Sequence, residues 1–264
     1  MESLAAPAGR LRPMSDDAGL QRPGPLRLDA TALFLDLDGT LTPMAARPQD
    51  VGPHGARNAL LRALAVRLDG RLAMVSGRTL ADIDRILDGA ARAAAGVHGL
   101  ERRRADGTIL RVRPSPELPA ARLALEAFAA AHPGVRIEDK RLSLAVHFRA
   151  TPGAGPAAIR AARSLAGRGG LVLQLGDHIA ELRTPGPDKG AAIHAFMAEP
   201  PFIGARPVFV GDDLTDEAGF AAARALGGVG VLVGPARPTA ATRQLDGVDA
   251  VLAWLRAAID GAAP

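Results

Sequence analysis

Two carboxylates separated by one residue are the feature of this sequence with the clearest chemical meaning. Asp36 and Asp38 follow directly after the apolar run at residues 32–35. Two carboxylates at positions i and i+2 beyond a buried strand project into one crevice and repel each other, so a metal ion or a shared proton must compensate their charge. Taken alone, Asp-Leu-Asp-Gly at 36–39 could equally form a turn, because Asp and Gly favour turns.

Further polar positions complete a candidate site for phosphoryl transfer. Asp212 and Asp213 end another apolar run and add oxygen ligands of the kind that Mg²⁺ prefers. Lys189, one of only two lysines, begins a helix-like stretch, where its charge and the free amides of a helix start would both face an anion. Ser76 supplies a hydroxyl at the end of a third apolar run. A carboxylate nucleophile, a metal, a lysine and small donors are the parts of a phosphoryl-transfer site.

Short, uniformly apolar runs precede these polar residues, and such runs are typical of strands buried on both faces of a parallel sheet. The runs lie at 32–35, 72–75, 208–210 and 229–233, and helix-like stretches lie at 55–68, 80–87, 189–197 and 216–225. This alternation predicts an α/β fold with a Rossmann-like, doubly wound parallel sheet. Ligands of such sheets bind outside the carboxyl ends of the strands, which is where Asp36, Ser76 and Asp212 fall.

The middle of the chain has a different pattern and predicts an inserted unit. Residues 135–149 alternate apolar and polar side chains, which indicates half-exposed antiparallel strands. Two helix-like stretches and two more strand-like runs accompany them, at 117–131, 155–165, 171–175 and 179–183. We therefore expect an α+β cap over residues 113–182, inserted into a core formed by residues 28–112 and 183–264. The joints between the two units are rich in proline, as expected of a hinge.

Composition excludes several classes of protein. The chain has 264 residues, of which 48% are hydrophobic and 23% charged, the values of a globular protein with a sizeable core. Aromatic residues make up only 3%, which argues against a stacking platform for single-stranded nucleic acid. The net charge is only +4 although the pI is 10.7, because most basic residues are arginine, and an anionic small molecule suits this balance better than nucleic acid. The absence of cysteine excludes disulfides, thiol catalysis and zinc–thiolate sites.

Targeting and membrane signals are not found in the sequence. No apolar run approaches the ~18 residues of a membrane span, and residues 1–27 lack the apolar core of a signal peptide. We expect residues 1–27 to be a disordered leader and the protein to be cytoplasmic. A small-molecule substrate is expected, with neither nucleic acid nor membrane as partner, and the sequence sets no expectation for oligomeric state.

The polar positions resemble, in order, the four motifs of the haloacid dehalogenase-like phosphatases. Residues 36–41 are similar to the first motif, Ser76-Gly77-Arg78 to the second, Lys189 to the third, and residues 211–217 to the fourth. Within that superfamily, linking segments resemble the trehalose-6-phosphate phosphatases, namely 97–99, 138–149, 188–190 and 202–213. The resemblance covers roughly residues 30–256. One departure is Val97, where many relatives carry Glu before His-Gly.

This resemblance implies a Mg²⁺-dependent phosphatase that hydrolyses trehalose 6-phosphate through an aspartyl-phosphate. Asp36 would be the nucleophile, and Asp38 would act first as general acid and then as general base. Mg²⁺ would be held by the Asp36 carboxylate, the Asp38 backbone carbonyl and the Asp212 carboxylate, with Asp213 nearby or acting through water. Phosphate oxygens would be bound by Ser76 and Lys189.

The resemblance also implies two groups of substrate contacts. In the core these are Asp36, Leu37, Asp38, Ser76, Gly77, Arg78 and His98. In the cap, a mobile lid over the crevice, they are Glu138, Lys140, Glu181 and Arg183, directed at sugar hydroxyls. The four cap residues could equally be charges on surface strands, and His98 and His147 could equally be buried hydrogen-bonding groups. Asp216 and Glu217 are expected to stabilise the start of a helix.

Two other functions stay open on the sequence. The core chemistry is indifferent to the sugar, so the substrate could be sucrose phosphate or mannosyl-3-phosphoglycerate. A non-catalytic phosphate-binding protein could also share this fold. The presence of Asp38 argues against that alternative, because a protein that only binds phosphate does not need a general acid.

Overall fold

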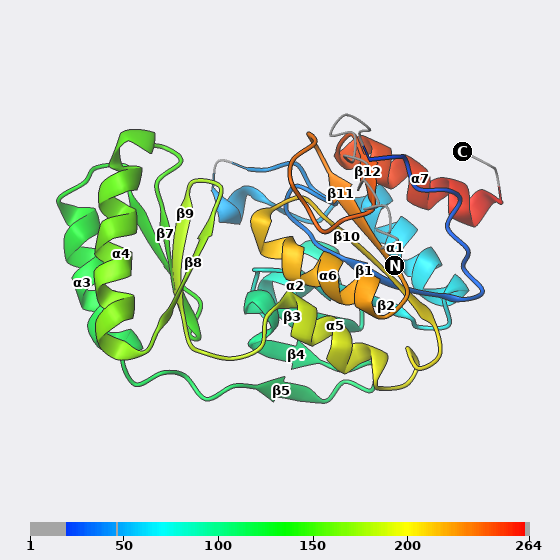
Figure 1. The fold of residues 1–264 in the computed structure, drawn as a ribbon, viewed down its shortest axis with the longest axis horizontal. Helices are drawn as coiled ribbons and strands as arrows, with labels where there is room; N and C mark the ends of the chain where they lie inside the picture. Colours follow the sequence, from blue (N-terminus) through cyan, green and yellow to red (C-terminus); the bar gives the residue numbers. More distant parts are fainter. Residues whose placement is uncertain (1–19, 46, 262–264) are drawn as a thin grey trace, which may run out of the picture.

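The computed structural model describes residues 20–45 and 47–261, and they form two lobes that lie side by side (Figure 1). The larger lobe is built on an eight-stranded sheet in the order β12-β11-β10-β1-β2-β3-β4-β5. Its strands are β1 (Thr31–Leu35), β2 (Leu72–Val75), β3 (Ala93–Gly96), β4 (Glu101–Arg103), β5 (Ile109–Arg111), β10 (Arg206–Gly211), β11 (Val229–Val233) and β12 (Arg243–Leu245). Strands β12 to β3 run parallel, and β4 and β5 add an antiparallel edge.

Helices cover both faces of this sheet. They are α1 (Gly55–Arg67), α2 (Leu80–Leu87), α5 (Lys189–Met197), α6 (Glu217–Ala225) and α7 (Val248–Asp260). Leu33 and Leu35 of β1 belong to the apolar cluster that includes α1, α2 and α7. Ala32 and Phe34 belong to the cluster with α5 and α6. Because alternate side chains of β1 are buried on opposite faces, the strand reads as continuously apolar, and the predicted doubly wound parallel sheet is confirmed.

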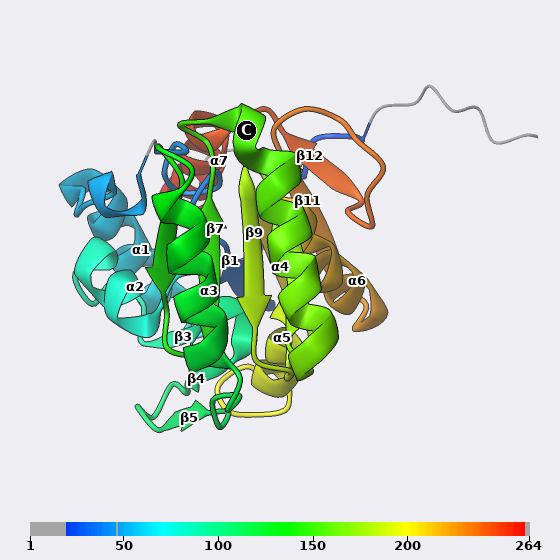
Figure 2. The ribbon, with the colours of Figure 1, turned by 90° about the vertical axis from the view of Figure 1, so that its left-hand side faces the viewer.

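The smaller lobe is a four-stranded antiparallel sheet in the order β6-β7-β9-β8, with two helices packed on one face (Figure 2). Its elements are α3 (Leu118–Ala130), β6 (Arg136–Asp139), β7 (Ser143–His147), α4 (Gly155–Gly169), β8 (Val172–Gly176) and β9 (Ile179–Arg183). Leu144, Val146, Ala180 and Leu182 pack in the apolar cluster with the helices. Since side chains alternate along a strand, the intervening residues of β7 and β9 turn their polar side chains toward the larger lobe, and we call this lobe the cap.

Several elements of the structure were not expected from the sequence patterns, among them β3, β4, β12 and α7. Strand β3 was not predicted, because its residues Ala-Ala-Ala-Gly carry little β preference; it is nevertheless buried between β2 and β4. The alternating segment 135–149 forms the antiparallel pair β6 and β7, with a turn at residues 140–142 that the alternation did not mark. Arg141, in the turn between them, has a φ of +67°, and its amide donates to Asp139 Oδ1 at 2.7 Å.

Part of the predicted disordered leader packs against the core. Residues 1–19 lie outside the described residues, whereas residues 20–27 are described. Leu26 is buried in the apolar cluster of the core, and Trp254 Nε1 donates to the Gly24 carbonyl at 2.8 Å. The expectation of disorder is therefore wrong for residues 20–27, since Leu26 and the Gly24 carbonyl both find partners in the core. Separately, none of the helices in the described ranges combines the length and apolarity needed to cross a membrane.

Candidate active site

The predicted site forms at the carboxyl edge of the large sheet. Strands β10, β1 and β2 are parallel neighbours, so the residues that follow them meet at this edge. Asp36 follows β1, Ser76 follows β2 and Asp212 follows β10. A cavity of about 420 Å³ opens here between the core and the cap, which is a size typical of small-molecule sites.

Most of the predicted site residues line this cavity. They are Asp36, Asp38, Ser76, Gly77, Arg78, His98, Glu138, Lys140, Glu181, Lys189, Asp212 and Asp213. Leu37 and Arg183 are not among the lining residues. The Leu37 side chain is fully buried in the core, because it points to the opposite side of the chain from the two aspartates that flank it. The Arg183 side chain is buried at the joint between the lobes, where it donates to the Pro187 carbonyl and to Gln174 Oε1.

Three carboxylates crowd together at the core end of the cavity. Oxygens of Asp36, Asp212 and Asp216 lie within 4.8 Å of one another. Burial, reinforced by the neighbouring negative charges, raises the pKa of Asp36 to about 7 and that of Asp212 to about 8. Buried like charges of this kind are stabilised by a cation, and carboxylate oxygens suit Mg²⁺. The donor set therefore fits the predicted metal.

Gly39 lets the loop after β1 approach this cluster. A Cβ on Gly39 would lie 2.0 Å from Asp212 Oδ2, and the residue has a φ of +78°, which favours glycine. Thr40, fully buried, donates to Asp212 Oδ1 at 3.4 Å. Any side chain at position 39 would push the first and fourth motifs apart.

Lys189 compensates part of the negative charge. Its Nζ lies 3.1 Å from Asp36 Oδ1 and 2.6 Å from Asp216 Oδ1, and the residue is buried. Burial acts to lower the pKa of Lys189, but the two carboxylates outweigh it and hold the pKa above its ordinary value. Helix α5 begins at this lysine because Asp188 accepts a hydrogen bond from the Ala191 amide at 2.8 Å and caps the helix.

Asp216 is a site residue that the sequence reasoning missed. We expected it only to stabilise a helix start, and it does belong to a capping box. It is also fully buried, and its Oδ2 accepts from the amides of Asp212 and Asp213, both at 3.0 Å, while Oδ1 pairs with Lys189. Its position within the fourth motif was the available signal, but an acid in a first helical turn is too common to single it out.

Asp213 lies apart from the carboxylate cluster, although it lines the cavity. Its Oδ1 accepts from the Leu214 amide at 2.7 Å at the start of a short 3₁₀ turn, Leu214–Asp216. The place expected for Asp213 beside Asp36 and Asp212 is thus taken by Asp216.

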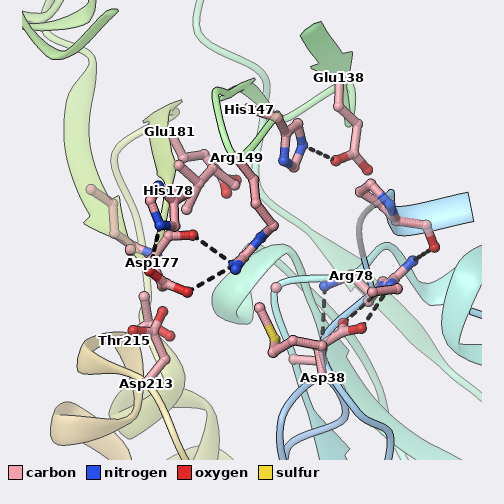
Figure 3. Close-up of a pocket in the computed structure, with 18 of the residues that line it drawn as sticks. Asp38, Arg78, Glu138, His147, Arg149, Asp177, His178, Glu181, Asp213 and Thr215 are labelled. Carbon is pink, nitrogen blue, oxygen red and sulfur yellow. Dashed lines mark hydrogen bonds and ion pairs between the residues drawn. The ribbon is translucent and has the colours of Figure 1, made fainter. Parts of the chain in front are cut away.

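Asp38 is held by Arg78 in a two-pronged ion pair (Figure 3). Arg78 Nε and Nη2 donate to the two Asp38 oxygens at 2.7 and 2.6 Å, and Nη1 donates to the Pro48 carbonyl at 2.6 Å. Bidentate pairs of this kind fix orientation as well as charge. Ser76 is buried beside them and accepts from the Arg78 amide at 3.3 Å.

The cap end of the cavity is polar (Figure 3). His147 Nε2 lies 2.8 Å from Glu138 Oε2, and Arg149 donates to Asp177 Oδ2 at 2.8 Å. Glu138 was predicted at this site, whereas Arg149 and Asp177 were not singled out. They come from the end of β7 and from the turn between β8 and β9, and only the fold of the cap brings them together.

Lys140 and Glu181 form a buried ion pair with Nζ 3.1 Å from Oε2. Glu181 also accepts from Ser143 Oγ, and His98 Nε2 lies 3.3 Å from its Oε2. Burial acts to raise the pKa of Glu181, but Lys140 and His98 outweigh it and hold the pKa well below its usual value.

Comparisons with known proteins agree with these motifs. A family model described as trehalose-phosphatase matches residues 34–249. The chain is 38% identical over 226 residues to a trehalose-6-phosphate phosphatase of Escherichia coli (strain K12), covering 85% of each chain. It is 36% identical over 237 residues to a probable trehalose-phosphate phosphatase of Sinorhizobium fredii (strain NBRC 101917 / NGR234), covering 86% of this chain and 89% of that relative.

Solved structures agree on the fold. The C-terminal domain of the C. albicans trehalose-6-phosphate phosphatase superposes with a TM-score of 0.78 at 21% identity, over 88% of this chain and 93% of that one. A trehalose-6-phosphate phosphatase related protein superposes with a TM-score of 0.68 at 26% identity, over 86% of this chain and 96% of that one. The Rossmann-like core with its cap is therefore an established architecture.

The low pKa of Glu181 predicts how stability responds to acid. Folded Glu181 keeps its charge at a pH where the unfolded chain already takes up a proton, so its contribution is complete above the usual value of 4.5 and is lost as the pH falls below it. We expect the difference in the free energy of unfolding between the wild type and Glu181→Gln to be largest near neutral pH and to shrink below pH 4.5. Urea titrations from pH 7 to 3 measure it. The exposed Glu126→Gln serves as control, and a difference that does not change with pH would contradict this assignment.

Proposed function

This chain belongs to the trehalose-phosphatase family, and on that premise we propose that it hydrolyses trehalose 6-phosphate to trehalose and phosphate as a phosphoric monoester hydrolase. The observation that carries the proposal is Asp36, a buried carboxylate beside Lys189 at the floor of a cavity that the cap completes. The names of the family and of its relatives favour trehalose 6-phosphate over sucrose phosphate and mannosyl-3-phosphoglycerate.

The reaction proceeds in two displacements at phosphorus. Asp36 attacks the phosphorus, the bond to the sugar oxygen breaks, and Asp38 gives its proton to that oxygen, which releases trehalose. Water then attacks the aspartyl-phosphate while Asp38 takes its proton, which releases phosphate and restores Asp36. Arg78 fixes the orientation of the Asp38 carboxylate through both of its oxygens, so for the acid step Asp38 must take up a proton and release one of these two contacts.

Charge neutralisation comes from Lys189, Ser76 and a metal. Lys189 and the Ser76 hydroxyl bind phosphate oxygens and neutralise the charge that develops on them. We propose Mg²⁺ as the cofactor, held by the carboxylates of Asp36 and Asp212 and by the backbone carbonyl of Asp38. When bound, Mg²⁺ supplies Lewis-acid stabilisation of the phosphate charge. Asp216 is not placed among the metal ligands, because its oxygens already accept from Lys189 and from the amides of Asp212 and Asp213. Its role is to hold these groups in position.

The cap would supply recognition of the sugar. Glu138 stands at the cap end of the cavity with His147 orienting it, and Lys140 and Glu181 also reach the cavity. These are the groups we propose for contact with sugar hydroxyls, and Arg183 is left out because it lies at the joint. A cytoplasmic location and the expectation that neither nucleic acid nor membrane is a partner stay predictions.

Asp36→Asn should abolish turnover, because an amide is a poor nucleophile and a poor ligand for a divalent cation. Release of phosphate from trehalose 6-phosphate measures the effect, and circular dichroism checks the fold. The exposed Asp249→Asn is a matched control that should keep full activity. More than about a hundredth of wild-type activity in Asp36→Asn would refute the covalent mechanism, since loss of a nucleophile costs several kcal/mol.

Removal of divalent cations should silence the enzyme. EDTA is expected to abolish phosphate release and added Mg²⁺ to restore it, because the site offers only oxygen ligands. Ca²⁺ should bind but support little turnover, since its larger coordination sphere disturbs the in-line geometry. Full activity in EDTA, or equal activity with Ca²⁺, would rule out the proposed site.

A panel of phosphorylated sugars tests the substrate. We expect kcat/KM for trehalose 6-phosphate to exceed that for sucrose 6-phosphate and glucose 6-phosphate by about 10-fold or more, because a site that hydrogen-bonds hydroxyls rejects analogues that leave its polar groups unpaired. Preference for another sugar phosphate would overturn the substrate and leave the phosphatase chemistry standing.

A further inference from the structure

Four residues make a closed set of contacts across the boundary between core and cap. Lys140 Nζ of the cap donates to the Gly77 carbonyl of the core at 3.0 Å and to Glu181 Oε2 at 3.1 Å. His98 Nε2 of the core lies 3.3 Å from the same Glu181 oxygen. The His98 ring also lies on Gly77, where a Cβ would come within 2.6 Å of the ring carbon Cε1. We call these four residues the core–cap bridge.

The backbone at Val97 and His98 adopts a left-handed conformation that residues other than glycine disfavour. Val97 and His98 have φ values of +46° and +57°, and left-handed residues other than glycine cost about 1–3 kcal/mol each. Two backbone hydrogen bonds hold them there: the Val97 amide donates to the Arg78 carbonyl at 2.8 Å, and the His98 amide donates to the Ser76 carbonyl at 2.9 Å. The strained turn is therefore tied to segment 76–78.

Segment 76–78 is the part of the core that the proposed chemistry depends on. It carries the Ser76 hydroxyl for phosphate and the Arg78 side chain that orients Asp38. Gly77 contacts two residues of the bridge, the His98 ring and the Lys140 ammonium group. The contacts between cap and core therefore act on the segment that binds phosphate and orients the general acid.

Both carboxylate oxygens of Glu181 are engaged by protein groups. Its Oε1 accepts from Ser143, its Oε2 faces both Lys140 and His98, and it is only 2% exposed. His98 is also buried, so the contact between the lobes lies away from water, where a hydrogen bond is electrostatically stronger than in solvent. A buried pair between two lobes favours the closed arrangement over the open one.

We infer that His98 is a positioning residue: through Glu181 and Lys140 it holds the cap closed and fixes segment 76–78 for phosphate and for Asp38. This inference rests on the proposed phosphatase function and extends it. It predicts that closure does not depend on the sugar alone. A small phosphate ester makes no sugar contacts with the cap, so its turnover should depend most on the bridge.

His98→Ala tests the inference with two substrates and a measurement of shape. We expect kcat for p-nitrophenyl phosphate to fall about 10-fold or more, as for loss of a buried polar contact, and kcat for trehalose 6-phosphate to fall less, because its sugar adds contacts to the cap. His98→Gln, whose amide can donate to Glu181, should recover to within about 3-fold by the same scale. The exposed His194→Ala is the matched control and should behave as wild type.

The radius of gyration of the Mg²⁺-loaded proteins without substrate, from small-angle X-ray scattering, reports closure directly. It should increase in His98→Ala and stay at the wild-type value in His98→Gln and His194→Ala. If His98→Ala does not fold, Gly77→Ala replaces it, because its Cβ displaces the His98 ring, and the same opening is expected.

Two results would overturn the inference. One is a wild-type radius together with unchanged turnover of p-nitrophenyl phosphate in His98→Ala. The other is a loss confined to trehalose 6-phosphate with an unchanged radius, which would make His98 a sugar contact. A wild-type enzyme that cleaves p-nitrophenyl phosphate but not trehalose 6-phosphate would instead refute the proposed function, while the radius still decides on the bridge.

Discussion

The burial of three carboxylates around one ammonium group is the constraint on which the rest of this structure depends. Asp36, Asp212 and Asp216 meet at the end of the central strands, and Lys189 offers one positive charge to them. Inside a protein such like charges repel strongly, so local structure must counter them. Two amides bond Asp216, and a glycine at position 39 leaves room for Asp212. The negative charge that remains is the feature of the site that suits a divalent cation.

The core of the site could be predicted because one short sequence pattern occurs three times and marks its residues. Each of Asp36, Ser76 and Asp212 follows a short apolar run, and parallel strands bring their ends to one edge. Asp216 could not be separated from an ordinary helix start, because its second role depends on Lys189, 27 positions away. The alanine strand β3 was equally hidden, because its place in the sheet comes from its neighbours and not from its own side chains.

The cap was predictable in kind but not in detail. Alternation along 135–149 correctly indicated antiparallel strands with one polar face, yet it could not say what that face meets. The four charged residues expected there have different surroundings: Glu138 pairs with His147, Lys140 and Glu181 turn to the core, and Arg183 lies at the joint. Pairings across two lobes depend on how the lobes dock, which no local pattern encodes.

The joint between the lobes limits how the cap can travel. The chain enters the cap near Ser115 and leaves it at Thr184, and the Ser115 amide donates to Thr184 Oγ1 at 3.1 Å. Thr184 is further tied to the cap through its amide, which donates to the Leu142 carbonyl at 2.9 Å. Two crossings that are hydrogen-bonded to each other favour rotation of the cap about the joint over sliding along the core. Rotation about such a joint would bring the same cap residues to the same core partners each time, so the joint itself would set their alignment.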